Sequence, residues 1–156
     1  MLEVLLVEDD SNKAQQIEAH LRQVRDEVRI ILAESYRSGL RQALERSFDV
    51  LCVDMTIPTF DQSSQEPGGR IRKDGGRHLI AELKRRGRAA RVIVITQFDE
   101  FGEGAGSLSL AQLRQEMAQE FPMHYVGAVF YQASNSAWKT ELNRYLELAE
   151  QGVCGA

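Results

Sequence analysis

The chain has 156 residues, of which 43% are hydrophobic and 27% charged, and its formal net charge is −4. This length and composition are typical of one globular domain with a substantial core. The negative balance argues against a nucleic-acid or anionic-membrane partner. No apolar run is long enough to span a bilayer, and the N-terminus lacks the basic segment of a signal peptide, so we expect a cytoplasmic protein.

Short apolar runs alternate with helical periodicity five times along the chain. In chain order the expected elements are a strand at 2–7, a helix at 11–25, a strand at 28–33, a helix at 36–47, a strand at 50–54, a helix near 75–86, a strand at 92–96, a helix near 108–120, a strand at 125–131 and a helix at 136–149. Strict alternation predicts an α/β fold with a doubly wound, five-stranded parallel sheet and helices on both faces. We expect the flavodoxin-like strand order 2-1-3-4-5.

The chain reads as one domain at 1–150 with a short tail at 151–156, and no attached effector domain is expected. Two connections, at 56–73 and 97–107, are longer than this fold needs. Long loops are usually lids, binding surfaces or disordered insertions, and the Gln-, Ser- and Gly-rich stretch 62–69 favours mobility. The cysteines Cys52 and Cys154 are expected to be reduced.

Polar side chains follow three of the predicted strands. Glu8, Asp9 and Asp10 follow the first strand, Asp54 ends the third and Thr96 ends the fourth. If these strands are parallel neighbours, the carboxylates converge on one sheet edge and repel each other unless a divalent cation neutralises them. A hard ion held by oxygen atoms is the expected partner. The competing interpretation is helix capping and solvation at strand ends, and Asp10 or Ser11 can cap the first helix.

The runs Leu5–Asp10, Asp54–Pro58 and Ile93–Thr96 together resemble the receiver domains of two-component response regulators, and the resemblance covers essentially the whole chain. It implies that Asp54 accepts a phosphoryl group from a histidine kinase or a phosphotransfer protein. It also implies that Thr96 contacts the phosphoryl oxygens.

The same resemblance implies a Mg²⁺ ion bound by Glu8, Asp9, Asp54 and the carbonyl of Thr56. Phosphoryl transfer to a carboxylate depends on such a cation, because both the nucleophile and the donor are negatively charged.

One departure from the family pattern concerns the end of the fifth strand. Receivers carry a lysine there, whereas this chain has Gln132, or Tyr131, in the matching place. We expect weaker or different phosphorylation without that cation. Arg70, Arg72 or Lys73 of the first long loop are candidate replacements.

These residues predict a signalling phosphoacceptor that switches a surface for an unidentified downstream protein; whether it forms a homodimer is left open. Its chemistry would be limited to acquiring and losing its own phosphoryl group, so it is not expected to be a metabolic enzyme. The alternative is a phosphorylation-independent pseudo-receiver that acts as a protein-interaction module. A small phosphatase of related topology is a third and weaker interpretation, because the second aspartate of that class is missing after Asp54.

Overall fold

The computed structural model describes residues 1–61, 71–72, 74–97, 100–101 and 108–155. Its main sheet has five parallel strands in the order β2-β1-β3-β6-β9. The strands are β1 (Leu2–Val7), β2 (Val28–Ala33), β3 (Val50–Val53), β6 (Val92–Thr96) and β9 (Tyr125–Phe130). Counting these long strands alone gives the order 2-1-3-4-5, so the predicted fold class and strand order are confirmed.

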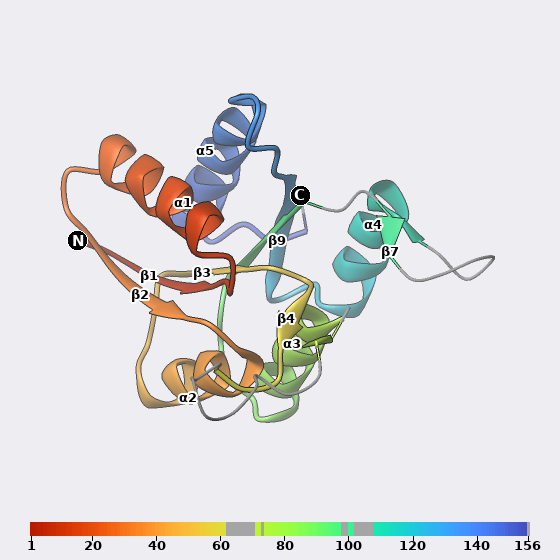
Figure 1. Ribbon diagram of the computed structural model, residues 1–156. Coiled ribbons are helices and arrows are strands. Elements are labelled where there is room, and N and C mark those ends of the chain that lie inside the picture. The colour runs from red at the N-terminus through yellow and green to blue at the C-terminus, as the bar shows by residue number, and fades with distance from the viewer. Residues whose placement is uncertain (62–70, 73, 98–99, 102–107, 156) are drawn as a thin grey trace.

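Helices cover both faces of this sheet (Figure 1). They are α1 (Ser11–Val24), α2 (Tyr36–Glu45), α3 (Gly75–Arg85), α4 (Leu110–Glu120) and α5 (Ala137–Glu150). Helices α1 and α5 pack on one face, while α2, α3 and α4 pack on the other. Among the helices described, none has both the length and the apolarity that crossing a membrane requires.

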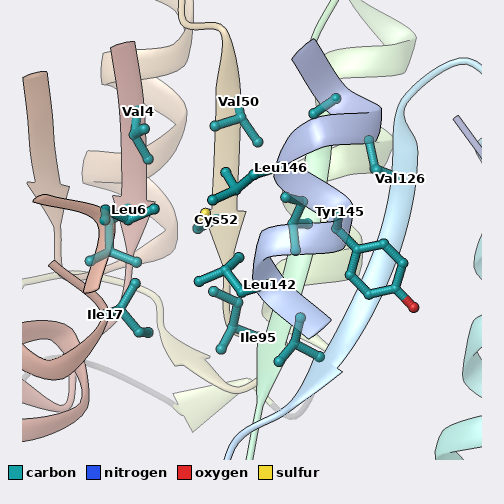
Figure 2. Packing of buried hydrophobic residues seen from close by; sticks show 14 of the residues in the cluster. Val4, Leu6, Ile17, Val50, Cys52, Ile95, Val126, Leu142, Tyr145 and Leu146 are labelled. Atoms are coloured by element: carbon teal, nitrogen blue, oxygen red, sulfur yellow. The ribbon is translucent and has the colours of Figure 1, made fainter. Parts of the chain in front are cut away.

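The core consists of two hydrophobic layers, one on each face of the sheet. Val4 and Leu6 point into the layer beneath α1 and α5, whereas Leu5 and Val7 of the same strand point into the opposite layer. Figure 2 shows the first layer, where Leu142 of α5 packs against the strands. Burial on both faces explains why the central strands β3 and β6 are nearly continuous apolar runs, whereas the less buried edge strand β2 contains Arg29.

Helix ends follow local capping chemistry. The side chain of Asp10 accepts a hydrogen bond from the backbone N–H of Lys13, which confirms Asp10 as the cap of α1. Ser109 forms a capping box with Gln112, so α4 begins at Leu110, two residues later than the periodicity predicts. Gly87 follows α3 with a φ of 68°, a backbone conformation that glycine adopts without strain.

The two long connections each contain a short hairpin that the sequence analysis did not predict. Strand β4 (Ile57–Pro58) pairs with β5 (Ile71–Arg72), and β7 (Glu100–Phe101) pairs with β8 (Leu108–Ser109). Two residues are too few to show a periodicity, so these strands leave no readable sequence pattern. The predicted mobility of 62–69 lies outside the described residues.

Gly127 allows α5 to approach the sheet closely. A methyl group added at this β9 position would overlap the ring of Tyr145, which lies against the strand (Figure 2). We expect Gly127→Ala to destabilise the protein by roughly 1–3 kcal/mol through overpacking, measured by urea unfolding. The same change made in a Tyr145→Leu background should cost clearly less. An equal cost in both backgrounds would mean that the ring is not the obstacle.

The two cysteines are free, as predicted, and they differ in burial. Cys52 is completely buried in β3, and burial raises the pKa of its thiol to about 12. Cys154 is partly exposed near the C-terminus. At pH 8 we expect Ellman's reagent to modify Cys154 in the folded protein and both thiols in denaturant, because the thiolate is the reactive form. Rapid modification of Cys52 in the native Cys154→Ser variant would contradict this packing.

Candidate functional site

Parallel register brings the ends of β1, β3 and β6 together at one edge of the sheet. Val7 lies opposite Val53, which in turn lies opposite Val94. The ladder continues one step further, because the Asp54 N–H donates to the carbonyl oxygen of Val7 at 3.1 Å. Glu8 and Asp54, which directly follow Val7 and Val53, are therefore neighbours.

Glu8, Asp9 and Asp54 form an acidic cluster at this edge. Each contributes one carboxylate oxygen, and the three oxygens lie within 4.8 Å of one another. Glu8 and Asp54 are 2% and 5% exposed, whereas Asp9 is open to solvent. The structure thus brings together the three carboxylates that the sequence analysis selected.

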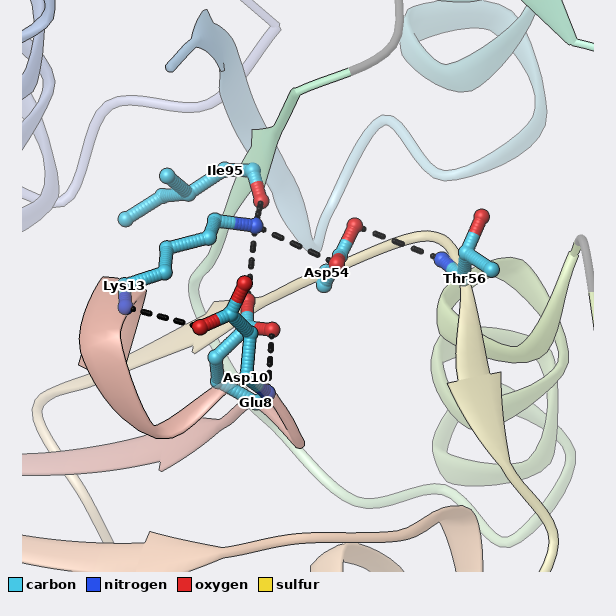
Figure 3. Close-up of polar contacts among 6 residues, drawn as sticks. All are labelled: Glu8, Asp10, Lys13, Asp54, Thr56 and Ile95. Carbon is cyan, nitrogen blue, oxygen red and sulfur yellow. Dashed lines mark hydrogen bonds and ion pairs between the residues drawn. The ribbon is translucent and has the colours of Figure 1, made fainter. Parts of the chain in front are cut away.

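A buried lysine lies inside this cluster, and the sequence analysis did not select it. The Lys13 Nζ lies 2.6 Å from Glu8 Oε2, 3.1 Å from Asp54 Oδ2 and 2.7 Å from the carbonyl oxygen of Ile95 (Figure 3). The side chain is only 1% exposed. An ammonium group has three N–H donors, so these three oxygens use its full capacity.

Helix α1 directs Lys13 inward. Lys13 lies four residues before Ile17, and both belong to the buried face of the helix together with Leu21. A cation in the first turn is disfavoured by the helix dipole, and burying it costs further free energy. The neighbouring carboxylates compensate for both effects. A lysine on the apolar face of the helix, three residues after the acidic run that ends at Asp10, was the available sequence signal.

Burial disfavours the negative charge of these carboxylates, and the positive charge of Lys13 compensates for it only in part. The pKa of Glu8 is raised to about 7, chiefly by burial, with Asp54 adding to the effect and Lys13 opposing it. Burial also raises the pKa of Asp9, and the charge of Asp54 contributes. One ammonium group thus only partly offsets the negative charge of three carboxylates.

The donor set fits a small hard cation. Glu8 Oε1 accepts the Asp10 N–H at 3.1 Å and Asp54 Oδ1 accepts the Thr56 N–H at 3.3 Å, which fixes both carboxylate planes. Asp9 forms the exposed side of the cluster, through which an ion can enter. All three groups offer oxygen ligands, as Mg²⁺ prefers.

The other predicted site residues occupy different positions around the cluster. Thr56 contributes its backbone N–H to Asp54, while Thr96 is fully buried at the end of β6, directly after Ile95. Gln132 is exposed, and its side-chain oxygen accepts a hydrogen bond from Asn135. Its selection as the residue in the place of the lysine stays a prediction.

Tyr131 and Lys13 together fill the space beside Asp54. Tyr131 is buried, and its ring centroid lies 5.7 Å from the Lys13 Nζ. The ring of Trp138 in α5 packs on two other rings. Its centroid lies 5.1 Å from the ring centroid of Tyr131 and 5.4 Å from that of His20 in α1. The rings of Tyr131, Trp138 and His20 thus pack in a row that begins beside Lys13 and continues between α1 and α5. The side chains of Arg70, Arg72 and Lys73, the predicted replacements for the lysine, lie outside the described residues.

No protein-family model matches the sequence. The response regulatory protein DtcB of the Detocs system from Enterobacter cloacae is 32% identical over 98 residues, which is 61% of this chain and 64% of DtcB. Among solved structures, a response-regulator receiver domain from Clostridium thermocellum is 20% identical with a TM-score of 0.62, covering 97% of this chain and 95% of that one. The chain has the fold of a response-regulator receiver domain.

A second receiver structure is relevant to the acidic cluster. The receiver domain of the sensor histidine kinase PA1611 from Pseudomonas aeruginosa PAO1 has a magnesium ion coordinated in its active-site cleft. It is 20% identical to this chain with a TM-score of 0.61, and the match covers 96% of this chain and 98% of that one. This likeness shows the shared receiver fold. The evidence for a metal site in this chain comes from its own residues.

Asp9 is the member of the cluster best suited to a test of this charge balance. We expect Asp9→Asn to stabilise the protein in Mg²⁺-free buffer, because it removes a negative charge beside Asp54. The gain should be below about 1 kcal/mol, since exposed charge pairs interact weakly. We also expect Mg²⁺ to raise the Tm of the wild type and to raise that of the variant much less, because the stabilisation that a ligand gives falls as its affinity falls.

Thermal unfolding with and without Mg²⁺ measures both effects. Asp26→Asn, an exposed substitution between α1 and β2, is the matched control and should change neither. A wild-type Mg²⁺ response in Asp9→Asn would show that this carboxylate does not hold the ion.

Proposed function

We propose that this chain is a two-component receiver that accepts a phosphoryl group on Asp54 with the help of Mg²⁺. The position of Asp54 carries the proposal: it ends a central strand of a receiver fold, is nearly buried, and lies among Glu8, Asp9 and a buried ammonium group. Relatedness to DtcB, which is named a response regulatory protein, supports the signalling class.

The chemistry follows from the arrangement of Asp54. One carboxylate oxygen attacks the phosphorus of the donor, the new O–P bond forms, and the bond from phosphorus to the leaving group breaks with its electron pair. The Thr56 N–H and the Lys13 ammonium hold the carboxylate in place, so little reorganisation precedes attack. When bound, Mg²⁺ would be held by Glu8, Asp9, Asp54 and the carbonyl of Thr56, and it would neutralise charge on the transferring group.

Transmission of the switch involves Thr96 in this proposal. Its hydroxyl is the predicted contact for the phosphoryl oxygens, and its carbonyl accepts the N–H of Tyr131 at 2.7 Å. A phosphoryl group adds roughly −1.5 to −2 charges at Asp54, enough to reorganise neighbouring hydroxyl and amide groups. The surface near the end of β6 would then bind or release a protein partner. The phosphoryl donor would be a histidine kinase or a phosphotransfer protein.

The pseudo-receiver alternative depends mainly on the missing lysine after β9. Lys13 weakens that argument, because an ammonium group does contact Asp54, though from α1. An acidic cluster also costs stability through charge repulsion, and such a cost is expected at a functional site rather than in a purely structural one.

Small phosphodonors provide the test. Incubation with acetyl phosphate and Mg²⁺ should add the mass of one phosphoryl group in intact-protein mass spectrometry. We expect Asp54→Asn to abolish this addition, whereas Asp26→Asn should leave it unchanged. Addition of chelator should also prevent it, because the donor and the acidic cluster repel each other without the cation.

Absence of labelling in the wild type, despite Mg²⁺ and excess donor, would contradict the proposal and favour the pseudo-receiver. Labelling that persists in Asp54→Asn would place the acceptor elsewhere. Turnover of exogenous phosphomonoesters would instead favour the phosphatase interpretation.

A further inference from the structure

We propose that Lys13 of α1 is the cation that pairs with Asp54 before phosphoryl transfer and with the phosphoryl oxygens after it. This inference rests on the proposed function. Among the described residues, Lys13 is the cation that forms an ion pair with Asp54, at 3.1 Å from Oδ2. The same ammonium contacts Glu8 and the Ile95 carbonyl, so it lies where the ends of three strands meet.

The charge balance of the reaction explains why a cation is needed at this point. Attack converts a carboxylate oxygen into the bridging oxygen of an acyl phosphate, and the negative charge then lies on the phosphoryl oxygens. An ammonium group already bonded to Asp54 can follow that charge by rotation of its side chain, without a change in the backbone. Charge-assisted hydrogen bonds of this kind are about twice as strong as neutral ones.

The surroundings of Lys13 are more specific than helix packing requires. A lysine in the first turn of a helix opposes the dipole, and its burial demands that every donor be satisfied. Replacing a whole buried ion pair by apolar groups of similar size is often neutral for stability, whereas removing one partner leaves a buried charge unpaired. A methionine at position 13 would continue the apolar face formed by Ile17 and Leu21, so packing alone gives no reason for lysine.

Tyr131 limits where the ammonium can move. The centroid of its ring lies 5.7 Å from the Lys13 Nζ. The same ring packs against Trp138, with the two ring centroids 5.1 Å apart. The aromatic face favours a cation and excludes water on that side. The ammonium is thereby confined to the side of the site that carries Asp54 and Ile95.

Lys13→Met is the first test, because it removes the charge and keeps most of the side chain's length. We expect labelling by acetyl phosphate to slow by about tenfold or more, the factor that corresponds to loss of one charge-assisted hydrogen bond. Mg²⁺ affinity, measured by isothermal titration calorimetry, should stay equal or increase, because a competing positive charge has gone. A purely structural role would disturb the acidic cluster and lower both quantities together.

A transplanted lysine provides the matched rescue. In the Lys13→Met background, Tyr131→Lys places an ammonium group on the buried position beside the cluster, whereas Gln132→Lys places the same charge on an exposed position. We expect Tyr131→Lys to restore part of the labelling rate and Gln132→Lys to restore none. Equal rescue by both would indicate a general charge effect and overturn the specific role of Lys13.

Circular dichroism first establishes that each variant is folded. If Lys13→Met does not fold, Lys13→Arg replaces it, since arginine keeps the ion pairs but holds its charge on a larger planar group. Its labelling should still be slower than that of the wild type. Wild-type rates in the folded Lys13 variant would overturn this inference, while loss of labelling in Asp54→Asn would leave the proposed function standing. A wild type that takes up no phosphoryl group would overturn both.

Discussion

The site depends on one buried ammonium group shared by three oxygens. Lys13 contacts Glu8, Asp54 and the Ile95 carbonyl, and these belong to the ends of three different strands. Without it, the two buried carboxylates of Glu8 and Asp54 would be neighbours with no positive charge paired to them among the described residues. Because the ammonium offsets only part of their charge, the cluster has the chemistry of the Mg²⁺ site that we propose. A single lysine thus stabilises the site without fully neutralising its negative charge.

The parallel sheet brings these polar groups together. Pairing of Val7 with Val53 and of Val53 with Val94 fixes where each strand ends, so the following residues meet without any dedicated loop. Helix α1 then starts directly after β1 and carries Lys13 back over the same edge. The two hydrophobic layers hold the strands from both faces, which limits the freedom of the polar groups at their ends.

The sequence was sufficient for the main elements because their patterns are long. Apolar runs of four to six residues and helices of ten or more residues make the alternation readable, and Glu8, Asp9 and Asp54 follow directly from the strand ends. The two-residue strands left no periodicity to detect. Lys13 was missed for a different reason: lysine is normally assigned to solvent, and its inward position depends partly on oxygens of Asp54 and Ile95, which lie far along the chain. Gln132 was selected by its place in the chain, but the structure turns it outward.

The position of the cation in α1 determines which elements a phosphoryl group on Asp54 would influence under the proposed function. A lysine that followed β9 would connect Asp54 to the β9–α5 segment through its own backbone. Lys13 instead connects Asp54 to α1 through its backbone and to β6 through the Ile95 carbonyl, one residue before Thr96. The end of β9 contributes the aromatic ring of Tyr131, which is packed on Trp138 and contacts the cation through its face. A change in charge at Asp54 would therefore act first on β6 and α1. It would reach β9 and α5 through the hydrogen bond from the Tyr131 N–H to the Thr96 carbonyl and through the packing of Tyr131 against Lys13 and Trp138.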